Sequence, residues 1–150
     1  MIIAERKFTI NSSRERIWEC IIKALMRCIP FEGMQFADER SFSAILRMKM
    51  GFITLPVRIK MEIIDIVKLE SIVTTLQARG LGGLVWFNQK ATFTLTTVDE
   101  SKTEVASKME AEGMATFLRI FLLWKVKSFA RDSLDSVRVL LKEWTEPQSV

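Results

Sequence analysis

The chain has 150 residues, of which 49% are hydrophobic and 27% are charged, and its formal net charge is +4. This balance is typical of a folded globular protein and excludes extensive disorder. The basic residues are scattered along the sequence rather than gathered into a stripe with aromatic neighbours, so we do not expect nucleic-acid binding.

We expect a single cytoplasmic domain over residues 1–150. The first ten residues contain charges and no apolar run of signal-peptide length, and no uncharged apolar stretch reaches 18 residues. The two cysteines, Cys20 and Cys28, fall in a segment with helical periodicity, which would place their Cα atoms about 12 Å apart. Because a disulfide requires a Cα separation below about 7 Å, we expect two reduced thiols in the core.

The chain begins with a predicted strand over residues 2–10, followed by a helix. Ser12 and Glu15 have the spacing of a capping box, in which each residue bonds the backbone of the other at the start of a helix. Apolar residues then recur at helical spacing as far as Cys28, and Pro30 ends the helical pattern. A break before Pro30 would divide this segment into two short helices.

From Gly33 onward the apolar period changes from 3.6 to 2, which predicts strands. The clearest strand covers residues 53–63, where apolar residues alternate with mostly polar ones. Pro56 within it favours an edge position or a bulge. The later alternating segments and the turns between them are residues 72–78, a glycine-rich turn at 80–83, residues 91–97, a polar turn at 99–102, and residues 105–111.

A helix of about 30 residues, roughly 45 Å long, is predicted from Met114 to Trp144. Apolar residues cover nearly the whole circumference of its first half, so this half must be buried on more than one side. A sheet that wraps around the helix, or a partner, would provide that burial. The sequence therefore predicts an α+β helix-grip fold. In it, a curved antiparallel sheet of six to seven strands surrounds a long C-terminal helix, with one or two short helices after the first strand.

The sequence contains no histidine and no tyrosine, which excludes Ser-His and Cys-His nucleophiles and the commonest metal ligand. The cysteines lack the CxxC spacing, and the glycine-rich turn lies between two strands rather than before a helix. Four carboxylates near strand ends are predicted on the solvent face, namely Glu62, Asp65, Glu110 and Glu112. We therefore expect no metal, no cofactor and no enzymatic activity. A cyclase- or hydrolase-type activity ranks last among the alternatives.

Methionines concentrate on the apolar strand faces, and methionine adapts to irregular cavities. A sheet curved around a long helix tends to leave space at its wider end, where we expect a cavity for a hydrophobic small molecule. A one-residue slip in register would exchange the two faces of a strand. The predicted ligand-binding residues are Met48, Met50, Ile59, Met61, Leu76, Phe93 and Met109 from the sheet, and Phe117, Phe121 and Trp124 from the helix.

Four segments, in order, carry a resemblance to a known group of proteins. They are the strand, polar turn and tryptophan-bearing helix over 8–18, Cys28-Ile29-Pro30, the turn at 80–83, and the strand and glycine at 109–113 before the long helix. This pattern resembles the START/Bet v 1-like (SRPBCC) superfamily, and most closely its carbon monoxide dehydrogenase G-subunit family. Phe31 stands where that family often has glycine.

The resemblance implies a fold that holds lipids, sterols, quinones or aromatic molecules between sheet and helix. For the G-subunit family it implies a role in assembly, membrane recruitment or quinone delivery for molybdenum-containing dehydrogenases. Our first hypothesis is accordingly a non-catalytic carrier of a lipid, quinone or similar molecule.

The alternative is an accessory protein that docks a molybdenum-containing dehydrogenase to the inner face of the membrane or aids its assembly. Leu118, Leu122 and Leu123 cannot all face the sheet together with the three aromatic residues of the helix. The basic residues near them suit anionic lipid; these are Arg119, Lys125 and Lys127. A homodimer through the same patch would explain it equally well.

Overall fold

The computed structural model describes residues 1–50 and 52–147, apart from the side chain of Met50. Its helices are α1 (Arg14–Arg27), α2 (Thr116–Phe121) and α3 (Leu123–Thr145), and a short 3-10 turn, η1, covers Leu81–Gly83. The strands are β1 (Ile2–Ile10), β2 (Glu32–Asp38), β3 (Ser41–Met50), β4 (Ile53–Val67), β5 (Ser71–Gly80), β6 (Val85–Asp99) and β7 (Lys102–Met114).

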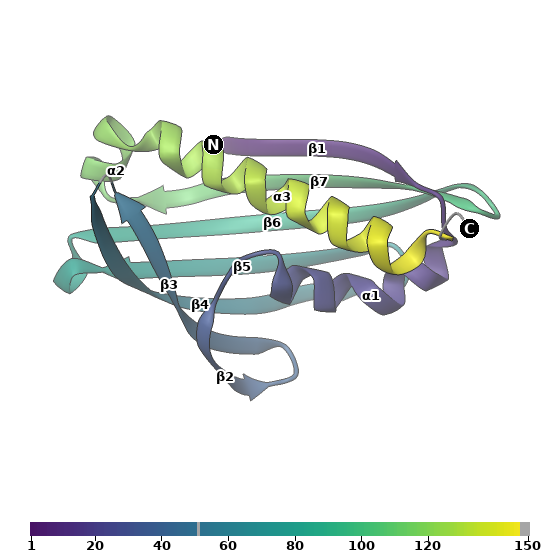
Figure 1. The fold of residues 1–150 in the computed structure, drawn as a ribbon, viewed down its shortest axis with the longest axis horizontal. Coiled ribbons are helices and arrows are strands. Elements are labelled where there is room, and N and C mark those ends of the chain that lie inside the picture. Colours follow the sequence, from purple (N-terminus) through teal and green to yellow (C-terminus); the bar gives the residue numbers. More distant parts are fainter. Residues whose placement is uncertain (51, 148–150) are drawn as a thin grey trace.

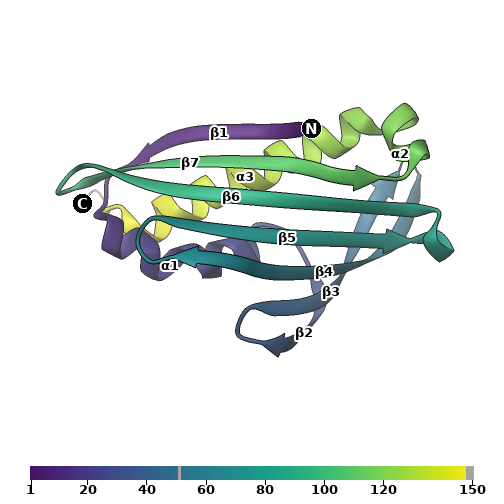
Figure 2. The ribbon, with the colours of Figure 1, turned by 180° about the vertical axis from the view of Figure 1, so that it is seen from behind.

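The strands form one antiparallel sheet in the order β1-β7-β6-β5-β4-β3-β2. The long helix α3 crosses one face of the curved sheet, beside α1 (Figure 1), and the view from behind shows the strands in front of the helices (Figure 2). The predicted α+β helix-grip fold is confirmed, with one helix after the first strand.

The core lies between the inner face of the sheet and one side of α3. Period-2 alternation places Ile72 of β5 and Phe93 of β6 directly opposite each other, and both are almost fully buried. On α3, Leu134, Val137 and Leu141 are completely buried at helical spacing.

The predicted uninterrupted C-terminal helix is bent at Leu122, which divides it into α2 and α3. Leu122 has φ −128° and ψ 14°, outside the helical range. Hydrogen bonding nevertheless continues through the bend, because the Leu122 amide donates to the Leu118 carbonyl (3.0 Å) and the Val126 amide to the Leu122 carbonyl (3.0 Å). The bend allows the apolar inner sides of both segments to reach the sheet, with Leu118 and Val126 both buried.

The start of α1 differs from the prediction by one residue. Ser13, not Ser12, caps the helix, since the amide of Arg16 donates to Ser13 Oγ (3.3 Å). Ser12 is buried, and its carbonyl accepts a hydrogen bond from Thr103 Oγ1 (2.9 Å). The capping-box spacing identified the right turn but the wrong serine.

The two predicted irregularities of the sheet are confirmed. Residues 53–57 of β4 pair with β3 but lie beyond the paired part of β5, so Pro56 occupies a local edge without a shift in register. In the turn between β5 and β6, Gly82 and Gly83 have φ of +61° and +96°. Leu81 also has positive φ, +50°, which is strained for a residue with a side chain.

Both cysteines are free and half-buried, and burial raises the pKa of the Cys28 thiol to about 12. A raised pKa leaves almost no thiolate at pH 8, and the thiolate is the reactive form. We predict that iodoacetamide at pH 8 leaves Cys28 unmodified in the folded protein but alkylates it in urea, as peptide mass spectrometry would show. Rapid alkylation of Cys28 in the folded protein would contradict this burial.

Candidate ligand-binding site

A cavity of about 60 Å³ lies between the sheet and the start of the C-terminal helical segments. Strands β3 to β6 form one wall, and α2, the bend and the first turns of α3 form the other. The side chains around it are almost all apolar: Leu46, Met48, Leu55, Pro56, Val57, Ile59, Leu76, Ala78, Leu81, Val85, Phe87, Leu118, Leu122, Lys125, Val126 and Phe129.

Three of the predicted sheet residues, Met48, Ile59 and Leu76, line this cavity. Phe93 and Met109 are buried in the main core without lining it. Met61 is also buried, but it packs in a second cluster with Phe42 and Ala44. The side chain of Met50 lies outside the described part of the structure.

The three helix residues expected to face the sheet point elsewhere, which corrects the sequence-based prediction. Phe117, Phe121 and Trp124 are 49%, 62% and 64% exposed. The cavity wall is formed instead by other apolar residues of the same segments, namely Leu118, Leu122, Val126 and Phe129. Where apolar residues surround a helix, periodicity cannot fix its rotation, so the sequence offered no basis for choosing between the two sets.

The remaining sheet residues of the cavity wall were missed, although the same alternation identifies them. Val57 shares the phase of Ile59, and Val85 and Phe87 share the phase of Phe93 along β6. A preference for methionine and for residues near the middle of the strands drew the prediction away from this end of the sheet.

One charged side chain, Lys125, belongs to the described lining. Its ammonium donates a hydrogen bond to the backbone carbonyl of Lys49 (2.8 Å), close to the end of β3, and lies 5.7 Å from the centre of the Trp124 ring. The contact joins the first turn of α3 to the β3–β4 hairpin. It therefore closes one side of the cavity with a polar bond.

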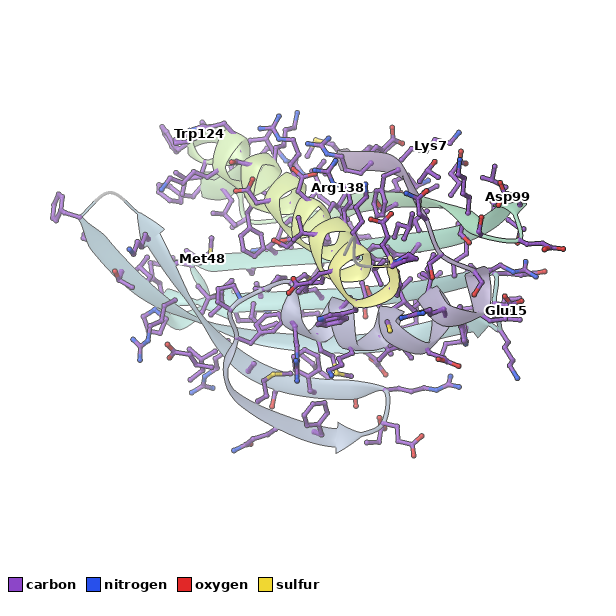
Figure 3. The ribbon with its side chains drawn as sticks, turned by 45° about the vertical axis from the view of Figure 1, so that its right-hand side comes forward. Lys7, Glu15, Met48, Asp99, Trp124 and Arg138 are labelled. Carbon is purple, nitrogen blue, oxygen red and sulfur yellow. The ribbon has the colours of Figure 1, made fainter. Side chains whose placement is uncertain are left out.

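A set of exposed apolar residues, which we call the apolar rim, surrounds the same end of the molecule. Its members come from the β3–β4 turn, the β5–β6 turn and the α2–α3 segment: Phe52, Ile53, Leu81, Leu84, Phe117, Ile120, Phe121 and Trp124. Phe52 is 99% exposed and Leu84 is 75% exposed. In Figure 3, Trp124 and Met48 lie at this end, and Glu15 and Asp99 lie at the opposite end.

Basic residues that look scattered in the sequence are gathered by the fold toward the rim. Residues 41–61, 71–98 and 113–131 contain ten of the 22 lysines and arginines and no aspartate or glutamate. These stretches supply the turns and the helical segment that form the apolar rim. The rest of the chain holds 12 basic residues against all 18 acidic ones, so charge is separated along the molecule.

The carboxylates lie as predicted on the solvent side of the sheet. Glu62, Asp65 and Glu112 are exposed, and the half-buried Glu110 pairs with Lys108 (3.1 Å). None of them lines the cavity. Among residues 1–50 and 52–147, no cluster of three or more histidine, cysteine, aspartate or glutamate side chains could hold a metal ion. No helix in the described part of the chain is long and apolar enough to cross a membrane.

Comparisons with solved structures show the same fold in several proteins. A conserved protein from Geobacillus kaustophilus superimposes with a TM-score of 0.76 at 12% identity, covering 93% of this chain and 91% of that one. A START superfamily protein from Mycobacterium smegmatis has a TM-score of 0.67 at 14% identity, covering 95% and 96%. The di-domain ARO/CYC protein StfQ of the steffimycin biosynthetic pathway has a TM-score of 0.59 at 12% identity, covering 97% of this chain and 51% of its own.

A search of curated protein sequences gave no match. The family model of the carbon monoxide dehydrogenase G-subunit (CoxG), in contrast, matches residues 7–133. That range is most of the chain and includes the second half of β1, all the other strands and the first part of α3. The protein therefore belongs to the CoxG family of carbon monoxide dehydrogenase.

Proposed function

We propose that the protein is a non-catalytic carrier that binds a hydrophobic small molecule, such as a lipid or a quinone, in the cavity between sheet and helix. Family membership and the START-type fold support a ligand-binding or accessory role in general. The observation that carries the finer proposal is the wall of the cavity, which is apolar apart from Lys125. Burial of apolar ligand surface against such a wall supplies about 25 cal/mol per Å² before ordering costs.

The small volume of the cavity sets a condition on this function. At about 60 Å³ it is well below the roughly 150 Å³ of an engineered apolar cavity that binds benzene. A lipid or quinone must therefore widen the cavity, and the bend at Leu122 is the natural place for α2 to move. The opposite end of α3 is held more firmly, because Glu146 accepts a hydrogen bond from the Asn11 amide (2.7 Å) and Thr145 is buried.

Native mass spectrometry of gently purified protein, followed by solvent extraction, tests the carrier function. We expect a fraction of the protein to carry a low-mass apolar molecule that extraction releases and identifies. A bare chain that also fails to bind small aromatic probes in titration would contradict the proposal.

A second function, docking to an anionic membrane surface, is favoured by the apolar rim and the charge around it. Exposed Phe, Trp and Leu side chains at one end of a protein can enter the headgroup region, and surrounding lysines and arginines are attracted to anionic lipid. Of the ten basic residues in the three acid-free stretches, only Arg47 forms an ion pair with a described residue, at 2.8 Å from Glu32. The charge of the other nine is therefore not neutralised by a carboxylate in the described part of the chain.

We predict that the protein co-sediments with phosphatidylserine-containing vesicles at low salt and less at high salt. The double variant Phe121→Glu/Trp124→Glu should bind at least about tenfold more weakly, since it places two charges where apolar side chains enter the bilayer. Val139→Glu is the matched control, because Val139 is 54% exposed on α3 outside the rim. Equal binding by all three proteins would remove the rim from membrane docking.

If the wild type binds no vesicles at either salt concentration, the rim would instead meet a protein. Membership of the CoxG family then makes a molybdenum-containing carbon monoxide dehydrogenase the first partner to test. A second copy of the chain is the remaining alternative, which sedimentation equilibrium of the purified protein would detect.

A further inference from the structure

The inner face of β6 contains one polar side chain, Gln89. The residues that share this face are apolar: Val85, Phe87, Ala91, Phe93 and Leu95. Gln89 is only 5% exposed, so its amide group is enclosed between sheet and helix. A glutamine in a buried apolar row is unusual, and the chemistry of its surroundings decides what it does there.

The side-chain carbonyl oxygen of Gln89, Oε1, is fully buried and has no hydrogen-bond partner among the described residues. Nearly all buried polar atoms in folded proteins are hydrogen-bonded, and an unpaired one is destabilising. A leucine or methionine at the same position would fill similar space without this cost. The unpaired oxygen is therefore a feature that packing alone does not explain.

Gln89 borders the inner end of the apolar cavity. Leu76 lies directly across from it on β5, and Phe87 precedes it by two residues on the same face of β6; both line the cavity. On its other side, the β6–β7 register shifts between Asn88 and Gln89, so a bulge interrupts the ladder there. Bulges commonly redirect side chains next to binding sites.

The two polar groups near the cavity lie in different surroundings. Lys125 is beside the β3–β4 hairpin and already donates its hydrogen bond to the Lys49 carbonyl. Gln89 is deeper and offers an unused acceptor. A ligand that enters past the rim would therefore meet an apolar wall first and a hydrogen-bond acceptor last.

We propose that the cavity selects hydrophobic ligands that carry a hydrogen-bond donor, such as a hydroxyl or phenol group, at the end that enters first. That group donates its hydrogen to Gln89 Oε1, while the apolar remainder packs against Leu76, Phe87 and the helix. The inference rests on the proposed carrier function and specifies its ligand class. It favours alcohols, phenols and hydroquinones over ethers, esters and quinones, which offer only acceptors.

Three small probes that differ at one group test this inference. They are 4-methylphenol, which has a donor, 4-methylanisole, which has the same oxygen without a donor, and toluene, which has neither. Dissociation constants would be measured by ¹H–¹⁵N NMR titration of the full chain. We expect 4-methylphenol to bind about three- to tenfold more tightly than 4-methylanisole, the ratio expected for one hydrogen bond.

The variants Gln89→Leu and Gln89→Met should lose this preference while still binding toluene, and Gln89→Leu should have a higher Tm than the wild type. Gln77→Leu, on the exposed outer face of β5, is the matched control and should keep the preference. Equal wild-type affinity for 4-methylphenol and 4-methylanisole, as a bound water on Gln89 would produce, overturns this inference alone. A wild type that binds none of the three probes overturns the carrier function, and this inference with it.

Discussion

Replacing Phe93 with alanine is expected to lower the free energy of unfolding by about 3–5 kcal/mol. Phe93 is 2% exposed and lies opposite Ile72 in the centre of the sheet, so the shortened side chain would leave a cavity that the surrounding strands cannot fill. Phe121→Ala is the matched control. Because Phe121 is 62% exposed, its removal should change stability by no more than about 0.5 kcal/mol.

Urea denaturation followed by tryptophan fluorescence measures both variants on one scale. Similar destabilisation by Phe93→Ala and Phe121→Ala would mean that Phe121 packs inside the protein, against the structure. The comparison therefore also tests the rotation of the α2–α3 segment, on which the apolar rim depends.

Replacing Ala78 with leucine is expected to weaken the binding of small apolar probes at least about tenfold, or about 1.4 kcal/mol. Ala78 is buried, faces the cavity from β5, and sits beside the lining residues of β4 and β6. The added carbons would occupy a space of only about 60 Å³. Filling an existing cavity commonly maintains or raises stability, so Tm should not fall by more than a few degrees.

Gln77→Leu again serves as the control, since it adds the same side chain to the opposite face of the same strand. Toluene titration of both variants separates blockage of the cavity from a general effect of added apolar surface. Unchanged affinity in Ala78→Leu would place the binding site away from this cavity.

The strands could be predicted from the sequence because a buried face and a solvent face leave a period of two. Val57, Ile59, Met61 and Ile63 are all buried as their alternation requires. The helix before Pro30 and the turn at Gly82 were equally legible, since proline and glycine impose specific backbone angles. The fold class followed from the order of these elements.

The helical wall of the site could not be predicted in the same way. From Phe117 to Trp124 apolar residues point in all directions, and only contact with the sheet decides that Leu118 and Leu122 face inward. The bend at Leu122 has no proline or glycine to announce it. It follows from tertiary packing, which a one-dimensional pattern does not contain.

Gln89 illustrates a signal that the sequence did offer. It follows Phe87 and precedes Ala91 at the spacing of a buried strand face, so its burial could have been deduced from alternation. That its oxygen lacks a partner among the described residues could not, because hydrogen bonds depend on neighbours contributed by other strands and by the helix.

The separation of charge along the molecule has a kinetic consequence. A chain with ten basic and no acidic residues in the stretches that form one end, and a net negative remainder, has a large electric dipole moment. In the field of an anionic bilayer it would rotate during diffusion, so that most encounters begin with the apolar rim forward. Raising the ionic strength should then slow the association rate steeply and leave the dissociation rate, set by inserted aromatic side chains, nearly constant.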